Sequence, residues 1–304
     1  MSRFNTKEIR QFGKLEFFAR QVVEGFITGL HRSPFHGFSV EFAEHRAYNK
    51  GESTRHIDWK LFGKTEKLYT KRYDEETNLR CHILIDSSAS MYYPKGSENN
   101  KINFSVKAAA SLIHLMRMQR DAVGLGVFNE GVRLYTPAKL SGVHLNYIYH
   151  QLEQLQDETE PQGQTMAADS LHEFANRIHR RSVVFIFSDM LENNTENEER
   201  LFNALRHLRF QKHEVVLFHT LKEIDESKFE FDNRPYKFVD MESGEAVKLN
   251  PDEIRDEYVK AGSAFRNRLK SKCLQNKIEF IEADIDLGFN NILRSYLLKR
   301  KKTI

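Results

Sequence analysis

The pattern of hydrophobic and polar residues along this chain changes near residue 79. Beyond that point, short apolar runs of strand length alternate with longer segments in which apolar residues recur at helical spacing. Strands that alternate with helices indicate a mostly parallel sheet, so we predict a doubly wound α/β fold of Rossmann-like type. The predicted strands are Leu79 to Ile85, Ala122 to Phe128, Val183 to Phe187, Val215 to His219 and Ile278 to Glu282.

The segments between these strands are predicted to be helices. The clearest start signal is Asn250-Pro251-Asp252-Glu253, which offers an N-cap, a proline at the first helical position and two acids at the positive end of the helix dipole. The predicted helices are Ile102 to Met118, Leu145 to Leu155, Met166 to His179, Glu198 to Leu208, a long helix from this signal to about Leu274, and Asn290 to Lys299.

Hairpins interrupt this alternation at two places. Val132 to Tyr135 follows the turn Asn129-Glu130-Gly131 and is predicted to be an antiparallel edge strand. Tyr236 to Asp240 and Ala246 to Leu249 are predicted to form a hairpin inserted before the long helix, at 236–249.

The residues before position 79 lack the alternating pattern. Gln11 to Leu30 has helical spacing, and loop signals with short strand-like pieces such as Phe38 to Phe42 come after it. This segment holds enough aromatic residues to be ordered. We therefore predict an N-terminal appendage over residues 1–78, packed on an α/β domain over residues 79–304.

The overall charge gives no reason to expect a nucleic-acid partner. Basic residues number 46 and acidic residues 43, which leaves a net charge of only +3. The basic end Lys299-Arg300-Lys301-Lys302 is interpreted as a solvated helix end at the negative pole of the helix dipole. The alternative for this run is contact with acidic lipid or nucleic acid.

Cysteine content and hydropathy bear on the compartment. Cys81 and Cys273 fall in a predicted strand and a predicted helix, which fits reduced, buried thiols. The sequence has no apolar run of about 18 residues, and its first residues lead into no signal-type stretch. We expect a cytoplasmic protein with no membrane span.

Candidate chemistry first appears where the strand that starts at Leu79 ends. Asp86-Ser87-Ser88-Ala89-Ser90 places a carboxylate and two hydroxyls, those of Ser88 and Ser90, in one tight turn. Hard oxygen donors suit Mg²⁺ or Mn²⁺, and three protein oxygens leave an octahedral shell incomplete. The alternative is a solvated turn in which these side chains cap the following helix.

Further oxygen donors come from two later loops. Asp189 follows the strand that begins at Val183, which lies beside the first strand if the sheet order is 3-2-1-4-5-6. Thr165 precedes a predicted helix and would reach the same edge of the sheet. Asp86, Ser88, Ser90, Thr165 and Asp189 would then form one set of five oxygens. Taken singly, Thr165 is more readily a helix N-cap than a ligand, and the alternative for Asp189 is a helix cap or a solvated loop acid.

These residues resemble a known site. The order Asp86-x-Ser88-x-Ser90, Thr165, Asp189 is similar to the metal-ion-dependent adhesion site of von Willebrand factor A domains. Over a longer stretch, the chain resembles the bacterial domain-of-unknown-function-58 family, in the motifs Arg32-Ser33-Pro34-Phe35-His36-Gly37, Val40-Glu41-Phe42-Ala43-Glu44, Arg46-x-Tyr48, Gly51-Glu52, Arg55-x-Ile57-Asp58-Trp59-Lys60 and Lys71. Gln164 and Ser188 depart from the pattern, because many relatives have glycine there.

The resemblance implies a non-catalytic, metal-dependent protein-binding module. In such domains the serines and the threonine ligate the ion, the aspartates do so directly or through water, and a carboxylate of a partner completes the shell. Members of the family are encoded beside MoxR-type AAA+ ATPases, so the resemblance implies such an ATPase as partner.

Other functions would use the same part of the chain differently. A phosphatase-like enzyme would use Asp86 as nucleophile, but its acid/base aspartate would stand at position 88, which is serine. A scaffold with an empty metal site is a third possibility. Gly63-Lys64-Thr65 is not a P-loop, because Asp58 stands where the first glycine would be.

One cluster of the appendage keeps two interpretations. Arg46, Arg55, Asp58, Trp59 and Lys71 are either a buried ionic and aromatic cluster that pins the appendage on the sheet, or a docking surface.

Overall fold

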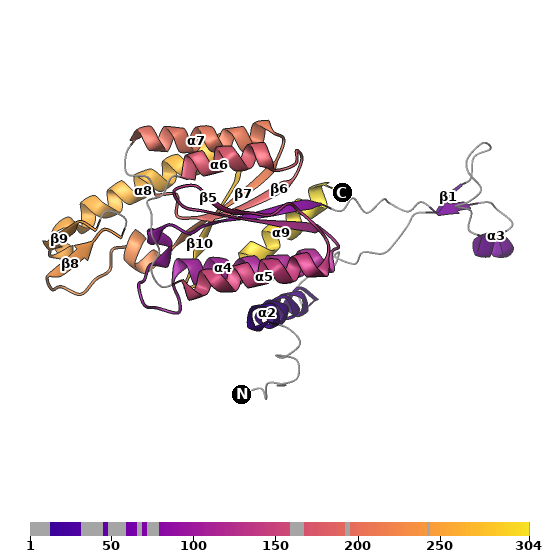
Figure 1. Ribbon diagram of the computed structural model, residues 1–304, viewed down its shortest axis with the longest axis horizontal. Helices are drawn as coiled ribbons and strands as arrows, with labels where there is room; N and C mark the ends of the chain where they lie inside the picture. Colours follow the sequence, from indigo (N-terminus) through magenta and orange to yellow (C-terminus); the bar gives the residue numbers. More distant parts are fainter. Residues whose placement is uncertain are drawn as a thin grey trace, which may run out of the picture.

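A central sheet between two layers of helices forms the body of the molecule (Figure 1). The structure is a computed structural model. It describes residues 13–31, 45–47, 59–65, 69–71, 79–158, 167–191, 195–241 and 244–303.

The six-stranded sheet has the order β10-β7-β6-β3-β4-β5. All neighbours are parallel except β4 and β5, which form the predicted antiparallel edge. If the six strands of this sheet are renumbered 1 to 6 in chain order, the order read from β5 to β10 is 3-2-1-4-5-6. The predicted doubly wound α/β fold and its strand order are therefore confirmed. The strands are β3 (Arg80–Asp86), β4 (Ala122–Phe128), β5 (Val132–Tyr135), β6 (Val183–Ser188), β7 (Glu214–Leu221) and β10 (Glu279–Asp284).

Helices cover both faces of the sheet, which explains why its central strands are apolar at successive positions. In β3, Ile83 and Ile85 belong to one core cluster and Leu84 to another, because successive side chains of a strand point to opposite faces. The first face packs against α4 (Lys101–Met118), α5 (Gly142–Asp157) and α9 (Asn290–Thr303), and the second against α6 (Ala167–Arg177), α7 (Thr195–Phe210) and α8 (Pro251–Gln275).

Helix α2 (Lys14–His31) packs beneath α4 and extends the first core. Its Leu15, Ala19 and Val23, which recur every four residues, are buried in that core. This part of the predicted appendage therefore packs on the α/β domain. The domain limits at 78 and 79 stay a prediction, and the strand expected at Phe38 to Phe42 lies outside the described residues. The appendage also contains β1 (His45–Ala47), which pairs with β2 (Tyr69–Lys71), and α3 (Trp59–Thr65).

Three short elements stand at the carboxyl edge of the sheet. The predicted hairpin is present as β8 (Tyr236–Val239) and β9 (Ala246–Leu249), and α8 follows it with Pro251 at its start. A 3-10 turn η2 (Ala89–Tyr92) and a π-helical turn η3 (Glu223–Ser227) were not expected from the sequence. Of the helices that the structure describes, none has the length and hydropathy to cross a membrane.

Gly124 makes room for a buried histidine. A Cβ atom at Gly124 would lie 2.6 Å from the Nδ1 atom of His82 and 2.6 Å from the carbonyl oxygen of Thr136. The His82 ring is parallel to that of Tyr135, with centroids 6.0 Å apart. The strand pair β3 and β4 therefore tolerates no side chain at this position without displacing the ring or the backbone.

We expect Gly124→Ala to lower the free energy of unfolding by about 1–3 kcal/mol, because overpacking moves neighbouring atoms. Urea unfolding measures the change. Gly142→Ala is the matched control, since a Cβ atom at Gly142 would meet no other side chain or strand within 4 Å. This control should stay within about 0.5 kcal/mol of the natural chain. Equal losses in the two variants would contradict the packing account.

His82 should also make stability depend on pH. Burial, with a contribution from His213, lowers the pKa of His82 from 6.5 to about 4. Between these values the unfolded chain takes up a proton that the folded chain does not, so the free energy of unfolding falls as pH falls. We expect His82 to contribute a loss of roughly 2 kcal/mol between pH 7 and pH 5. Urea titrations at both pH values should show a smaller loss in His82→Leu, and an unchanged loss would disprove the assignment.

Candidate metal centre

The ends of two neighbouring strands bring the predicted acids together. Strands β3 and β6 are parallel and in register, with Ile85 opposite Phe187. Asp86 is the last residue of β3, and Asp189 directly follows β6. Both acids are buried, and each lies within the electrostatic range of the other. The sheet therefore places two carboxylates at the edge that the strand order predicts.

The loop after β3 turns its alternate serines toward Asp86. The backbone nitrogen and the hydroxyl of Ser87 both donate to the carbonyl oxygen of Phe128, at 2.7 and 3.0 Å, and tie the loop to β4. Ser88 donates its backbone N–H to Oδ1 of Asp86 at 2.9 Å, and its Oγ lies 3.2 Å from Oγ of Ser90. The Ser90 side chain also helps to lower the pKa of Asp189.

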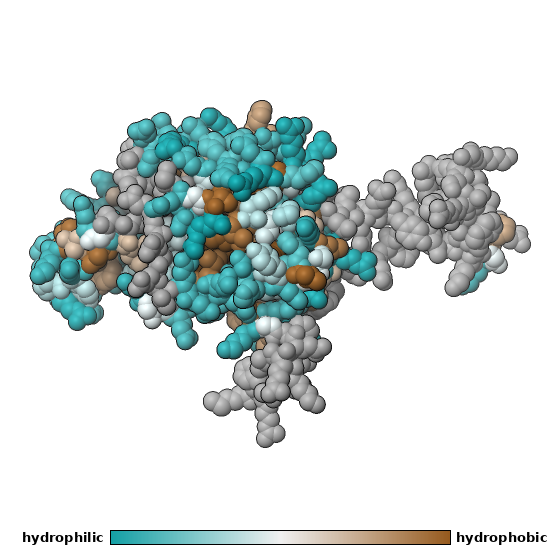
Figure 2. Space-filling view, in the orientation of Figure 1, coloured by the Kyte–Doolittle hydropathy of each residue, from teal (hydrophilic) through white to brown (hydrophobic). Residues whose placement is uncertain are grey.

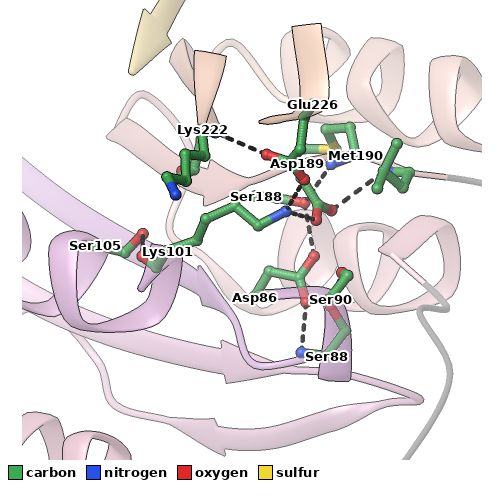
Figure 3. A network of polar contacts seen from close by, with 12 residues as sticks. Asp86, Ser88, Ser90, Lys101, Ser105, Ser188, Asp189, Met190, Lys222 and Glu226 are labelled. Carbon is green, nitrogen blue, oxygen red and sulfur yellow. Dashed lines mark hydrogen bonds and ion pairs between the residues drawn. The ribbon is translucent and has the colours of Figure 1, made fainter. Parts of the chain in front are cut away.

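Ser88 does not act as a helix cap. It occupies the N-cap position of η2, but its side chain makes no capping hydrogen bond. The Ser88 and Ser90 hydroxyls instead face each other beside the two acids (Figure 3). The alternative in which the Ser88 side chain caps the following helical turn is therefore wrong for η2.

Asp86 is held in an environment that disfavours its charge. The Ser188 hydroxyl donates to Oδ2 of Asp86 at 2.6 Å. Burial and the nearby Asp189 carboxylate nevertheless raise the pKa of Asp86 to about 7. The site is therefore short of positive charge near this carboxylate.

A buried lysine, not foreseen from the sequence, holds the second acid. The Nζ atom of Lys101 lies 2.8 Å from Oδ2 of Asp189 and 2.7 Å from Oε1 of Glu226, and the side chain is fully buried (Figure 3). Burial alone would lower the pKa of Lys101, but the two carboxylates raise it above its ordinary value. Lys101 likewise lowers the pKa of Asp189 against the effect of burial. This pair is therefore ionised at neutral pH.

The charges around the site do not balance. Among the residues that the structure describes, the cluster joined by these contacts holds three carboxylates, those of Asp86, Asp189 and Glu226, and the ammonium of Lys101, which leaves two negative charges when all four groups are ionised. Uncompensated buried charge is costly. A divalent cation would neutralise the cluster, and the carboxylate and hydroxyl oxygens are the donors that Mg²⁺ and Mn²⁺ take. The residues present therefore fit such an ion.

The structure accounts for part of the predicted set of five. It brings together Asp86, Ser88, Ser90 and Asp189, whereas Thr165 lies outside the described residues. Among the residues that the structure describes, no three His, Cys, Asp or Glu side chains gather in a way that could hold a metal ion. An ion at this edge would therefore depend on the serine hydroxyls.

The residues that sequence reasoning missed are Lys101, Ser188 and Glu226. Lys101 is the first residue of α4, where the helix dipole disfavours a cation, and this mismatch is a signal that the sequence carries. Glu226 lies in η3, a short acidic turn. Its few residues show no helical or strand periodicity from which its position could be predicted. The second cluster, Arg46, Arg55, Asp58, Trp59 and Lys71, has its side chains outside the described part and stays a prediction.

Removing the lysine should expose its role in stability. Lys101→Met leaves the buried Asp189 and the partly exposed Glu226 without their cation, so we expect a loss of about 3–5 kcal/mol in the free energy of unfolding, measured with a chelator present. Arg200→Met is the control, because Arg200 pairs with Asp169 at 2.8 Å with both side chains 48% exposed. That change should cost less than about 1 kcal/mol. Similar small losses in both variants would contradict the assignment of Lys101.

Comparison with known proteins places this chain in a family. Residues 44–268 match the model of a family described as "Protein of unknown function DUF58". An uncharacterized protein of Mycobacterium tuberculosis is 24% identical over 260 residues, which cover 83% of this chain and 77% of that one.

Two solved structures are distantly similar. An aerotolerance-related membrane protein from Bacteroides fragilis has a TM-score of 0.45 at 14% identity, over 74% of this chain and 99% of that one. The manganese-loaded TRAP protein of Plasmodium vivax has a TM-score of 0.35 at 17% identity, over 47% of this chain and 57% of that one.

Proposed function

The chain belongs to the protein family of unknown function DUF58, and we propose that it is a metal-dependent protein-binding module. The observation that carries the proposal is the net negative charge of the cluster of Asp86, Asp189, Glu226 and Lys101, beside the paired hydroxyls of Ser88 and Ser90. This arrangement supports a site for Mg²⁺ or Mn²⁺ that resembles a metal-ion-dependent adhesion site.

The residues at this site would have different roles. Asp86, Ser88 and Ser90 would hold the ion, together with Asp189 and with Thr165 of the predicted set. Ser188 orients Asp86 through its 2.6 Å hydrogen bond, and Lys101 fixes Asp189. When bound, the ion supplies a Lewis-acidic position to which a carboxylate of a partner can bind.

A binding role suits this chain better than catalysis. Phosphoryl transfer through Asp86 would need a general acid, and position 88 holds the hydroxyl of Ser88 instead. The other acid at this edge, Asp189, is already paired with Lys101. The proposed partner is a MoxR-type AAA+ ATPase that supplies an acidic side chain, and the proposed location is the cytoplasm.

We expect the chain to bind Mn²⁺ saturably and Asp86→Asn to bind it at least about tenfold more weakly, a difference of about 1.4 kcal/mol. Titration calorimetry measures both. Asp169→Asn removes an exposed acid on α6 and is the matched control, which should bind as the natural chain does. Equal affinity in the natural chain and Asp86→Asn would sink the metal assignment.

Two further measurements separate this function from its competitors. Capture of the purified ATPase by the immobilised chain should be lost in chelator, whereas a scaffold with an empty site would retain it. Mn²⁺-dependent hydrolysis of p-nitrophenyl phosphate that disappears in Asp86→Asn would overturn the binding role in favour of a phosphatase.

A further inference from the structure

The edge at which the parallel strands begin carries a row of basic residues. It lies at the opposite end of the strands from the candidate metal centre. The chain has arginine or lysine two positions before β4, β6, β7 and β10, and β3 itself begins with arginine. These strands are neighbours in the sheet, roughly 4.8 Å apart, so their amino ends form one row. This basic edge consists, from β10 to β4, of Lys277, Lys212, Arg181, Arg80 and Arg120.

Four of these basic residues occupy backbone positions that suit glycine. Arg120, Arg181, Lys212 and Lys277 come shortly after the ends of α4, α6, α7 and α8, with φ between 55° and 64°. Glycine is common in this left-handed conformation at helix ends, because it has no Cβ atom to be strained there. A single basic residue near a helix end is explained by the helix dipole. Its recurrence at four neighbouring loops gathers the charges on one surface.

The charges of the basic edge are available to a partner. The four residues with positive φ are exposed, and within the described part of the chain none of them makes an ion pair. Arg80 is also exposed and contacts the neutral ring of His179 at 2.8 Å. Of the described acids in these loops and at the starts of these strands, Asp121 is buried, and Glu214 and Glu279 are half-buried. The exposed charge of the edge is therefore positive.

Exposed apolar side chains lie beside the basic edge. Each of α4, α7 and α8 has one in its last turn, two or three positions before the basic residue that follows the helix. Met118 is 51% exposed, Phe210 81% and Leu274 78%. In the view of Figure 2, the surface over α6 and α7 is mostly hydrophilic, so an exposed apolar side chain is an exception there. Three helix ends thus present an apolar side chain together with a cation.

The end of α9 reaches the same edge. The Tyr296 hydroxyl donates to the carboxylate of Asp121, which also accepts from the backbone nitrogen of Leu79 at 3.0 Å. These bonds fix α9 against the loop that holds Arg120. From there α9 continues on this side of the body to Thr303, through the basic run at 299–302 (Figure 1). That run therefore lies next to an edge that is already positive, which favours an acidic partner over simple solvation.

The combination of charge and apolar surface indicates which acidic partner fits. Nucleic acids and anionic membranes both attract a row of cations. A phosphate backbone offers no place for the side chains of Met118, Phe210 and Leu274. The boundary between lipid headgroups and acyl chains takes such side chains while the neighbouring cations stay among the headgroups. The small net charge of +3 also argues against nucleic acid.

We propose that the basic edge binds the surface of an anionic lipid membrane without spanning it. The cations of the edge lie at the lipid phosphates, and Met118, Phe210 and Leu274 enter the headgroup boundary. In this orientation the candidate metal centre faces away from the membrane, because it lies at the other end of the same strands. This binding goes beyond the function proposed above and requires neither the ion nor a protein partner.

The test is cosedimentation of the full chain with vesicles in buffer that contains a chelator. The chain should bind vesicles of phosphatidylcholine mixed with phosphatidylglycerol, should not bind phosphatidylcholine alone, and should be released by salt. Arg181→Gln combined with Lys212→Gln should weaken binding at least about tenfold. The matched control is Lys237→Gln combined with Lys248→Gln, which removes the same charge from exposed cross-strand neighbours of the β8–β9 hairpin. This control should bind as the natural chain does.

A second pair of variants tests the apolar contribution. Phe210→Ser combined with Leu274→Ser should weaken binding to the mixed vesicles at least about threefold, because less apolar surface enters the lipid. The matched control is Val247→Ser combined with Leu287→Ser, whose side chains are 57% and 61% exposed away from the basic edge. Circular dichroism should show all four double variants folded, since each replaces only exposed side chains.

Several outcomes would overturn the proposal. These are no binding to the mixed vesicles, equal binding to phosphatidylcholine alone, or equal binding by the natural chain and either variant of the edge. Binding of double-stranded DNA that displaces the chain from vesicles and is unaffected by the Phe210 and Leu274 changes would assign the edge to nucleic acid, and would also overturn it. Since chelator is present throughout, these results do not depend on the Mn²⁺ titration, and either proposal can fail alone.

Discussion

The buried ammonium of Lys101 is the contact on which the carboxyl edge of this molecule depends. It joins Asp189, at the end of a central strand, to Glu226 in the π-helical turn η3, at 2.8 and 2.7 Å. A lysine without solvent contact is tolerated only because two carboxylates pair with it. Lys101 and Glu226 also line a cavity between η3, the β8–β9 hairpin and the start of α8, so the same contact lies between the candidate metal centre and that cavity.

This arrangement gives the two acids of the site different properties. Asp189 has its cation within the protein, so its pKa stays low. Among the described residues, Asp86 receives hydrogen bonds from Ser188 and Ser88 and makes no ion pair, and burial raises its pKa to about 7. The carboxylate that lacks a positively charged partner among the described residues is thus Asp86, beside the serine hydroxyls. For the ion that we propose, this difference would make Asp86 the first ligand, with Asp189 in a supporting position.

The sequence predicts the sheet and the position of the two acids because both follow from local rules. Parallel strands with helical crossovers order themselves predictably, and a residue at a strand end such as Asp86 or Asp189 then has a known place. Lys101 and Glu226 could not be predicted as partners, because a helix-start lysine and an acid in an irregular turn meet only through tertiary packing. The hairpin was predicted, but its contact with Phe229 depends on how η3 and α8 pack.

The proposed function depends above all on whether Asp86, Ser88 and Ser90 hold a divalent cation next to the paired Lys101 and Asp189. Diffraction from crystals grown with manganese, recorded at a wavelength where manganese scatters anomalously, tests this most directly. We expect an anomalous peak within bonding distance of the Asp86 carboxylate and both serine hydroxyls, with Lys101 still on Glu226. Well-ordered crystals with no anomalous peak at this edge, or with manganese bound only elsewhere, would contradict it.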